Sequence, residues 1–340
     1  MAEQPRRGLD PDTALPPVQP PSAAFLVQLF VVPLTIVACG LFVVWGFYWL
    51  AQLGNDPEGY VRALRRDNEG RWQVALNFAN DLRGPGGAKL KTDAGLASEL
   101  AGILADEVAS GRPRAAGRGG DQARALCGYL CRALGEFSVP EAAPPLIERA
   151  ADASDPQTAQ AAVEALAVLA DNLASAGAAF ADPAAVAAAT LAASRSDDMV
   201  LRSRAAYALG VLGGDVALAR LGELLDDPDD NVRCNAAVGL ARQGRVDGMG
   251  QLAEMLARED VAVPPGDEEA QARRYKRAMV VRNALKATAK YVDATGLAPP
   301  AEVVERLVAL DGDPVAEVRT DAAALSRRIG RLGVGEPSTP

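Results

Sequence analysis

The chain has 340 residues, a formal net charge of −9 and no histidine. The lack of imidazole excludes histidine general bases, Ser–His and Cys–His nucleophile pairs, and most zinc or non-haem iron sites. The excess of acid disfavours nucleic acid as a partner, because binding to a phosphate backbone needs clustered positive charge.

The N-terminal region predicts a disordered segment followed by a membrane anchor. Residues 1–22 are rich in proline and carry almost no large apolar side chain, so they cannot bury a core. From Ala23 to Leu50 no residue is charged, and about 20 such residues suffice to cross a bilayer. Aromatic residues, which prefer the headgroup layer, follow at the far end as Trp45, Phe47, Tyr48 and Trp49. We therefore predict one transmembrane helix over residues 23–53.

Two other roles for this apolar run stay open. A cleaved signal peptide has a shorter apolar core of roughly 7–15 residues. Ile36 to Cys39 resembles a bacterial lipobox, although a mostly apolar stretch follows Cys39 where a lipoprotein turns polar. An intact single-pass anchor is favoured over both.

The flanking arginines bear on the orientation of this anchor. The arginines before it are Arg6 and Arg7, and those after it are Arg62, Arg65, Arg66 and Arg71. The positive-inside rule then predicts a cytoplasmic repeat region, with an extracytoplasmic one as the alternative.

Beyond residue 56 the chain alternates apolar helical runs with glycine and proline, and alanine, the best helix former, supplies much of the apolar content. An Arg, a pair of small residues and a Leu recur at the same spacings in two segments. These are Arg202, Ala205-Ala206 and Leu209, and then Arg233, Ala236-Ala237 and Leu240. Spacings of three and four place such residues on one face of a helix. A helix–turn–helix unit that repeats in this way is typical of an α-solenoid.

The repeated pattern resembles the HEAT-repeat family, in particular its short bacterial form, which includes the PBS-lyase-type repeats. Related copies begin at Arg71, Arg124 and Arg319. The resemblance implies an all-α fold, a right-handed α-solenoid of helix pairs over residues 56–330. We expect residues 331–340 to form a disordered tail. The second helix of each pair would line the inner face.

Four Asp-Pro pairs precede predicted helices, at Asp155, Asp182, Asp227 and Asp313. Asp accepts hydrogen bonds from the free N–H groups of a first helical turn, and Pro has no N–H to leave unpaired. In the HEAT family, an Asp and an Arg six residues apart form a ladder between successive repeats. The resemblance implies such a structural ladder for Asp227 with Arg233 and for Asp313 with Arg319.

We expect neither a cofactor nor a metal site. Cys127 and Cys131 occupy the alanine and leucine positions of the repeat pattern, so we interpret them as small apolar packing residues. A metal or redox pair is the alternative, but no further cysteine stands at a suitable spacing.

Residues 266–290 open with acidic residues and continue with a basic stripe at four-residue spacing, made of Arg282, Lys286 and Lys290. A solvated helix face is the favoured interpretation, because acids then lie at the helix N-terminus and bases toward its C-terminus. The alternative is a contact for acidic lipid or an acidic partner.

The sequence predicts a membrane-anchored scaffold that is not an enzyme and binds a protein or peptide on its repeat surface. Stacked helix pairs offer a long, rigid surface with little ordering cost on binding. Candidate contacts are Arg204, Tyr207 and Asn235, which lie off the apolar stripe. The alternatives are a HEAT-like bilin lyase, which the resemblance suggests, and a purely structural envelope protein.

Overall fold

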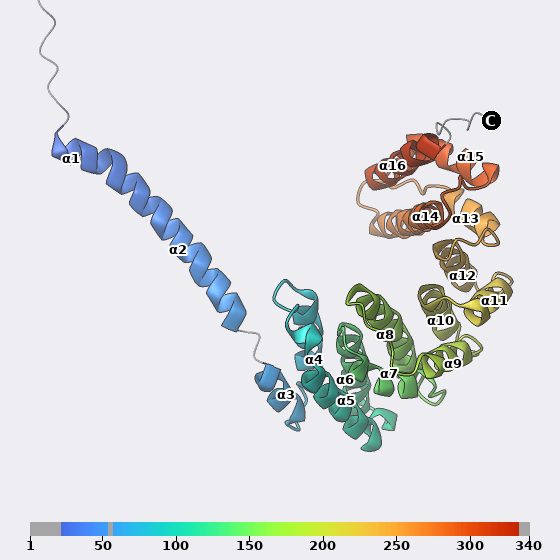
Figure 1. The fold of residues 1–340 in the computed structure, drawn as a ribbon, viewed down its shortest axis with the longest axis horizontal. Helices are drawn as coiled ribbons and strands as arrows, with labels where there is room; N and C mark the ends of the chain where they lie inside the picture. Colours follow the sequence, from blue (N-terminus) through green and yellow to red (C-terminus); the bar gives the residue numbers. More distant parts are fainter. Residues whose placement is uncertain (1–21, 54–56, 333–340) are drawn as a thin grey trace, which may run out of the picture. The chain divides into compact units, whose positions relative to one another are not determined.

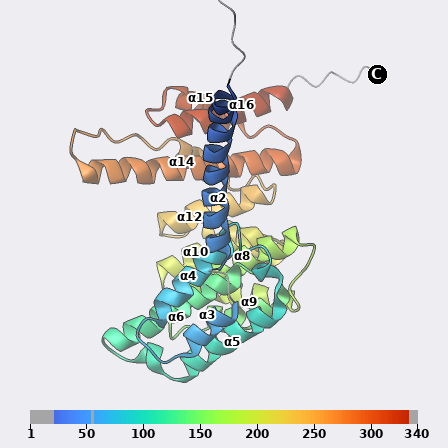
Figure 2. The ribbon, with the colours of Figure 1, turned by 90° about the vertical axis from the view of Figure 1, so that its left-hand side faces the viewer.

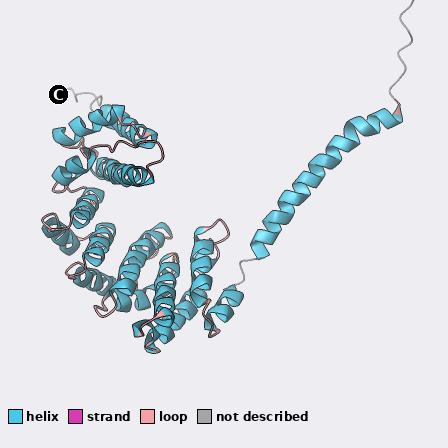
Figure 3. Cartoon of the chain, turned by 180° about the vertical axis from the view of Figure 1, so that it is seen from behind, coloured by secondary structure: helices cyan, strands magenta, loops and turns pink. Residues whose placement is uncertain are grey.

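The computed structural model describes residues 22–53 and 57–332, and every element in those ranges is a helix (Figure 3). The chain divides into two units, residues 1–55 and 56–340. Of the segments predicted to be disordered, residues 1–21 and 333–340 lie outside the described residues.

The first unit is a run of consecutive helical segments, namely α1 (Ala23–Leu26), the π-helix η1 (Val27–Val31) and α2 (Val32–Leu53). Residues 27–46 form a stretch long and apolar enough to span a membrane, and none of it is buried. The π-helix ends two residues before Pro33, which has no N–H to donate, and local π adjustments are a known way to accommodate proline in such a helix. The hydroxyl of Thr35 donates a 2.7 Å hydrogen bond to the carbonyl of Val31 in this region.

The second unit is an arc of helix pairs whose members alternate between two rows (Figure 1). The outer row consists of α3 (Pro57–Arg65), α5 (Ala94–Ala109), α7 (Ala143–Ala150), α9 (Pro183–Ala193), α11 (Asp215–Leu224), α13 (Met249–Leu256) and α15 (Ala301–Ala309). The inner row consists of α4 (Arg71–Arg83), α6 (Arg118–Gly135), α8 (Pro156–Ser175), α10 (Met199–Leu212), α12 (Asp230–Arg242), α14 (Glu268–Thr295) and α16 (Ala316–Leu332). Short 3-10 turns connect some of them, namely η2 (Leu90–Thr92), η3 (Arg112–Arg114), η4 (Pro140–Ala142) and η5 (Leu310–Gly312).

The second helix of each pair belongs to the inner row, which lies on the concave side of the arc (Figure 1). From α4 to α12, neighbours in the inner row contact each other more extensively than neighbours in the outer row. The closer spacing follows from small residues on the inner helices, and it makes the inner side concave. Helix α14 has 28 residues and reaches beyond the ends of its neighbours (Figure 2). The handedness of the solenoid stays a prediction.

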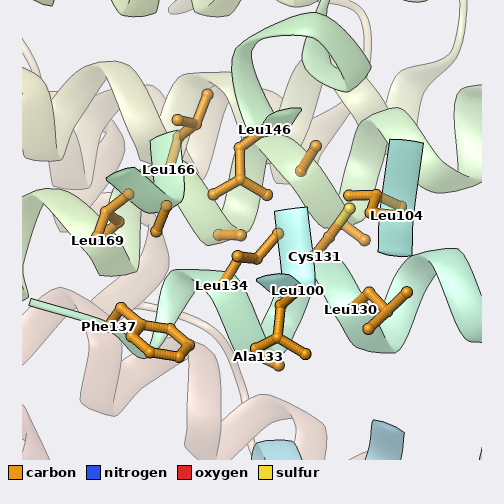
Figure 4. Packing of buried hydrophobic residues seen from close by; sticks show 14 of the residues in the cluster. Leu100, Leu104, Leu130, Cys131, Ala133, Leu134, Phe137, Leu146, Leu166 and Leu169 are labelled. Atoms are coloured by element: carbon orange, nitrogen blue, oxygen red, sulfur yellow. The ribbon is translucent and has the colours of Figure 1, made fainter. Parts of the chain in front are cut away.

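The core lies between the two rows. Leu100 of α5 and Leu146 of α7 meet Leu130 of α6 and Leu166 of α8, and all four are buried (Figure 4). The alanine pairs at 205–206 and 236–237 are fully buried. Alanine therefore serves here as the residue that lets inner helices approach.

Cys127 and Cys131 are buried in this core as free thiols. Burial raises the pKa of Cys127 to about 12 and also raises the pKa of Cys131. Both side chains are therefore neutral at physiological pH and pack as apolar groups.

The four Asp-Pro pairs do not all have the same structural role. Asp155 and Asp182 cap α8 and α9, each accepting a hydrogen bond from a first-turn backbone N–H. Helix α12 is instead capped by Asp229, and α16 begins at Ala316. The interpretation of all four as first-turn caps is wrong for Asp227 and Asp313, because their carboxylates accept the N–H groups of Asp229 and Val315, which precede the helices. An arginine of the preceding inner helix also holds each of these two carboxylates.

Candidate functional site

A cavity of about 640 Å³ opens on the concave side between α10, α12 and α14. We call it the concave groove. The three predicted contact residues, Arg204 and Tyr207 of α10 and Asn235 of α12, all line it. The structure therefore brings Arg204 and Asn235, which are 31 positions apart in the sequence, to the same cavity.

One part of the groove lining is apolar. Its aliphatic side chains come from four helices and are Met199, Val200, Val238, Met255, Val280 and Ala287. Met199 is 55% exposed and Val200 is 40% exposed, although both are large apolar residues. Exposed apolar surface in a concave site is a common feature of binding sites.

The charged part of the lining is mostly basic. Its cationic side chains are Arg204, Arg242, Arg258, Lys286 and Lys290, and its carboxylate is Asp229. That carboxylate already accepts hydrogen bonds from the backbone N–H groups of Asn231 and Val232. In a chain with a net charge of −9, this is a local concentration of positive charge.

The arginines and lysines of the groove differ in their partners. Arg204 pairs with Glu164, Arg242 lies 2.6 Å from Asp171, and Arg258 pairs with Asp230. Lys286 and Lys290 are exposed and form no ion pair within the described residues. These two ammonium groups are therefore the cations most available to an acidic ligand.

The predicted basic stripe is split by the structure. Arg282 donates from Nε to Asp321 of α16 at 2.7 Å, so it ties two inner helices together. Lys286 and Lys290, one and two turns later, face the groove. The favoured interpretation of a plain solvated face therefore describes only part of the stripe.

Asn235 and Tyr207 present polar groups beside these charges. The Asn235 amide nitrogen donates to the backbone oxygen and the hydroxyl of Ser203, at 3.0 and 2.9 Å. These two hydrogen bonds occupy the amide donor of Asn235 and link α12 to α10. Tyr207 is 36% exposed at the same wall.

Cys234 also lines the groove, and its Sγ lies 3.5 Å from an Arg258 nitrogen. Burial, followed by the nearby Asp230 carboxylate, raises the pKa of Cys234 to about 11. The thiol is therefore neutral near pH 7 and a poor nucleophile.

The ladder residues do not line the groove but contact residues that do: Arg233 shares the Asp230 carboxylate with Arg258, and Asp227 accepts the backbone N–H of Asp229. Asp227 receives Arg202 through two hydrogen bonds of 2.9 and 3.1 Å, so its carboxylate reaches the preceding repeat. Arg233 donates to the backbone oxygens of Asp227 and Pro228.

The last repeat has the same arrangement. Asp313 lies 2.5 Å from Arg277 of α14, and Arg319 donates to the backbone oxygen of Asp313. In both repeats the carboxylate contacts the previous inner helix, while the arginine six residues later holds the loop.

Sequence reasoning missed Arg242, Arg258 and Met255 as groove residues. No local signal marks them, because they reach the groove from the end of α12, the loop after α13 and α13 itself. The four-residue spacing of Lys286 and Lys290 was a usable signal, since it places them on one face of α14.

No protein-family profile matches the chain, and no curated protein sequence matches it. Solved structures do match. The CpcE–CpcF complex of phycocyanin lyase from Nostoc sp. PCC7120 is 18% identical over 81% of this chain and 94% of that chain, with a TM-score of 0.46. Human deoxyhypusine hydroxylase is 18% identical over 84% of this chain and 98% of that chain, with a TM-score of 0.32. The E. coli protein YibA is 16% identical over 84% of this chain and 96% of that chain, with a TM-score of 0.33.

These structures are HEAT-like helical repeat proteins, in agreement with the all-helical repeat fold of this chain. They also correct one expectation. The prediction that the chain is not an enzyme is not supported, since the matched structures include a lyase and a hydroxylase.

Proposed function

We propose that the concave groove binds an acidic, amphipathic segment of a partner protein, and that the apolar N-terminal helix anchors the chain to a membrane. The single observation that carries this proposal is the lining of the groove. Lys286 and Lys290, which form no ion pair in the described part of the chain, line the same cavity as the exposed Met199 and Val200. A ligand that satisfies both needs acidic groups next to apolar ones.

Charge complementarity favours an acidic ligand over a basic one. The paired arginines already have carboxylate partners, so the lysines supply the uncompensated charge of the groove. Exposed cations raise the association rate and specificity for an acidic partner more than they raise its affinity. The apolar wall would supply the area that a charged contact alone lacks.

The anchor rests on length and composition. Residues 27–46 are apolar enough to cross a bilayer, and none of them is buried in the protein. About 20 apolar residues match the hydrocarbon thickness. A retained anchor would hold the groove close to membrane-bound partners.

The groove is tested by binding of a fluorescein-labelled amphipathic peptide of glutamate and leucine to the full chain in a zwitterionic detergent. We expect the double variant Lys286→Gln/Lys290→Gln to weaken binding about tenfold or more at low salt, because charged hydrogen bonds and ion pairs at a binding site have this size. Anisotropy at increasing salt measures the loss.

The matched control is Lys89→Gln/Lys276→Gln, which removes the same charge from exposed sites outside the groove. Equal weakening in both double variants, or unchanged binding in the groove variant, would overturn the groove as the binding site.

A second candidate ligand is a bilin. The groove volume of about 640 Å³ lies within the usual range for small-molecule sites, and a bilin, an open-chain tetrapyrrole, combines a largely apolar conjugated chain of pyrroles with carboxylates. Adding a bilin to the full chain should then give an absorbance change that saturates at one equivalent and weakens in the Lys286→Gln/Lys290→Gln variant. Colour that stays on an added acceptor protein after denaturing electrophoresis would indicate lyase activity.

A further inference from the structure

A second, smaller cavity of about 220 Å³ opens on the concave side between α6, α8 and α10. Three of its lining residues are small, namely Ala125, Gly128 and Ala161. Its remaining lining residues are Tyr129, Arg132, Gln157, Gln160 and Arg204. The lining thus combines two guanidinium groups, two amides and a phenol, and it contains no carboxylate within the described residues.

Arg132 stands at this cavity without an anionic partner. Its guanidinium lies 5.4 Å from the centre of the Tyr129 ring, and that ring stacks on Trp72 with centroids 6.2 Å apart. Arg132 is exposed, and no ion pair to it occurs within the described ranges 22–53 and 57–332. The aromatic stack therefore fixes a cation that remains able to receive an anion.

Arg204 is the second cation of the cavity, and it is incompletely satisfied. It pairs with Glu164, but its Nε is buried and has no hydrogen-bond acceptor within the described residues. Burial first, and then the positive charge of Arg132, lower the pKa of Arg204. Two like charges therefore face one small space, and an anion between them would relieve their repulsion.

We propose that α6, α8 and α10 form an anion subsite, in which one carboxylate or phosphate group is held between Arg132 and Arg204. Arg204 lines both this subsite and the concave groove. The subsite therefore deepens the proposed function, since it would take an acidic group from the same ligand that occupies the groove. Gln157 and Gln160 line the same space. The Gln160 amide nitrogen already donates to Asp198 at 3.1 Å, so Gln157 and the second N–H of Gln160 supply the remaining amide donors.

Gly128 gives a way to fill the cavity without changing its charge. A Cβ added at Gly128 would meet no atom within 4 Å, so a side chain fits there and would enter the open space. Gly102 of α5 is an equally open position on an outer helix and does not line the cavity. Gly128→Leu, which fills the cavity, and Gly102→Leu, which does not, therefore form a matched pair of test and control variants.

The experiment uses the full chain in detergent with Trp45→Phe and Trp49→Phe, which leaves Trp72 as the sole tryptophan of the three in the sequence. The probes are O-phosphoserine and glutamate, titrated at constant ionic strength. We expect a saturable change in Trp72 emission, because an anion on Arg132 perturbs the Tyr129–Trp72 stack. The probe that binds more tightly identifies phosphate or carboxylate as the preferred group.

Arg132→Gln and Gly128→Leu should each weaken the response about tenfold or more, whereas Gly102→Leu should leave it unchanged. A ligand-induced rise in melting temperature, which needs no optical reporter, is measured in parallel. The subsite is overturned if neither probe gives a saturable response or a melting shift, or if Gly128→Leu and Arg132→Gln bind as tightly as the parent chain.

The outcomes also separate the subsite from the groove. Arg132 and Gly128 do not line the groove, and Lys286 and Lys290 do not line the subsite. If the acidic peptide depends on the lysines while the small anions ignore Gly128→Leu, the groove stands and the subsite fails. If Gly128→Leu weakens binding of the small anions while the acidic peptide binds equally well without the two lysines, the subsite stands and the proposed function fails.

Discussion

Asp227 links two repeats through a single side chain. Its carboxylate, 8% exposed, receives Nε and a terminal nitrogen of Arg202 from the preceding inner helix. It also accepts the backbone N–H of Asp229 at 2.9 Å. Burial opposes the charged form of Asp227, but the hydrogen bonds from Arg202 and Asp229 outweigh it and lower the pKa of Asp227.

This lowered pKa predicts how stability depends on pH. Because the ordinary pKa of Asp is about 3.9 and the folded value is lower, the stabilisation is complete at neutral pH. It declines as pH falls through the folded pKa. Asp227→Asn should cost about 2 kcal/mol at pH 7, the size of hydrogen bonds to a charged group. The difference from the parent chain should shrink toward pH 3, as measured by urea unfolding.

Asp226→Asn is the matched control, because Asp226 is the exposed neighbour of Asp227 and forms no side-chain bond within the described residues. A penalty for Asp227→Asn that is the same at pH 3 and pH 7 would contradict the role of its charge.

At the scale of elements, α10 and α12 make their closest approach through glycine. A Cβ added at Gly210 would lie 2.3 Å from the Cα of Gly239, and one added at Gly239 would lie 2.8 Å from the Cα of Gly210. Both obstacles are backbone atoms, so no side-chain movement can relieve them. These two glycines set the spacing of the helices that form one wall of the groove.

We therefore predict that Gly210→Ala destabilises the chain by about 1–3 kcal/mol, the usual cost of overpacking a tight contact. Gly222→Ala on α11 should instead stabilise the chain, because its added methyl meets no atom within 4 Å and alanine is favoured over glycine in a helix by up to about 1 kcal/mol. Urea unfolding followed by far-UV circular dichroism compares the two. A neutral or stabilising Gly210→Ala would refute the close approach.

At the scale of the whole molecule, the apolar helix exposes its large apolar side chains, whereas the repeat unit buries them. Large apolar side chains of the first unit, such as Leu34, Ile36 and Leu41, are 65–70% exposed. The repeat unit buries its leucines between two rows of helices. A lipid environment would account for the exposed apolar surface of the first unit.

The anchor is tested by Leu34→Arg/Leu41→Arg in the full chain. Each arginine near the middle of a span costs about 2.5–3.5 kcal/mol of insertion free energy. We expect the variant to move from the membrane pellet to the supernatant on alkaline extraction. Val246→Arg/Val308→Arg, at exposed sites of the repeat unit, should stay in the pellet. A parent chain already in the supernatant would rule out a retained anchor.

The repeat fold could be predicted from particular residues because its signals are local. Ala205-Ala206 and Leu209 share a helix face by spacing alone, and a face of small residues needs a neighbouring helix to cover it. The groove could not be predicted in the same way. Lys286 and Arg204 are far apart in the sequence, and their common cavity depends on how three inner helices are stacked.

The sequence by itself determined that the chain is helical and repetitive and that it carries one apolar run long enough to cross a membrane, because periodicity and composition act over a few turns. Only the tertiary structure decided which charges remain unpaired. It removed Arg282 from the basic stripe by pairing it with Asp321, and it left Lys286 and Lys290 in the groove. Pairing depends on distances between elements, and these distances exist only once the helices have packed.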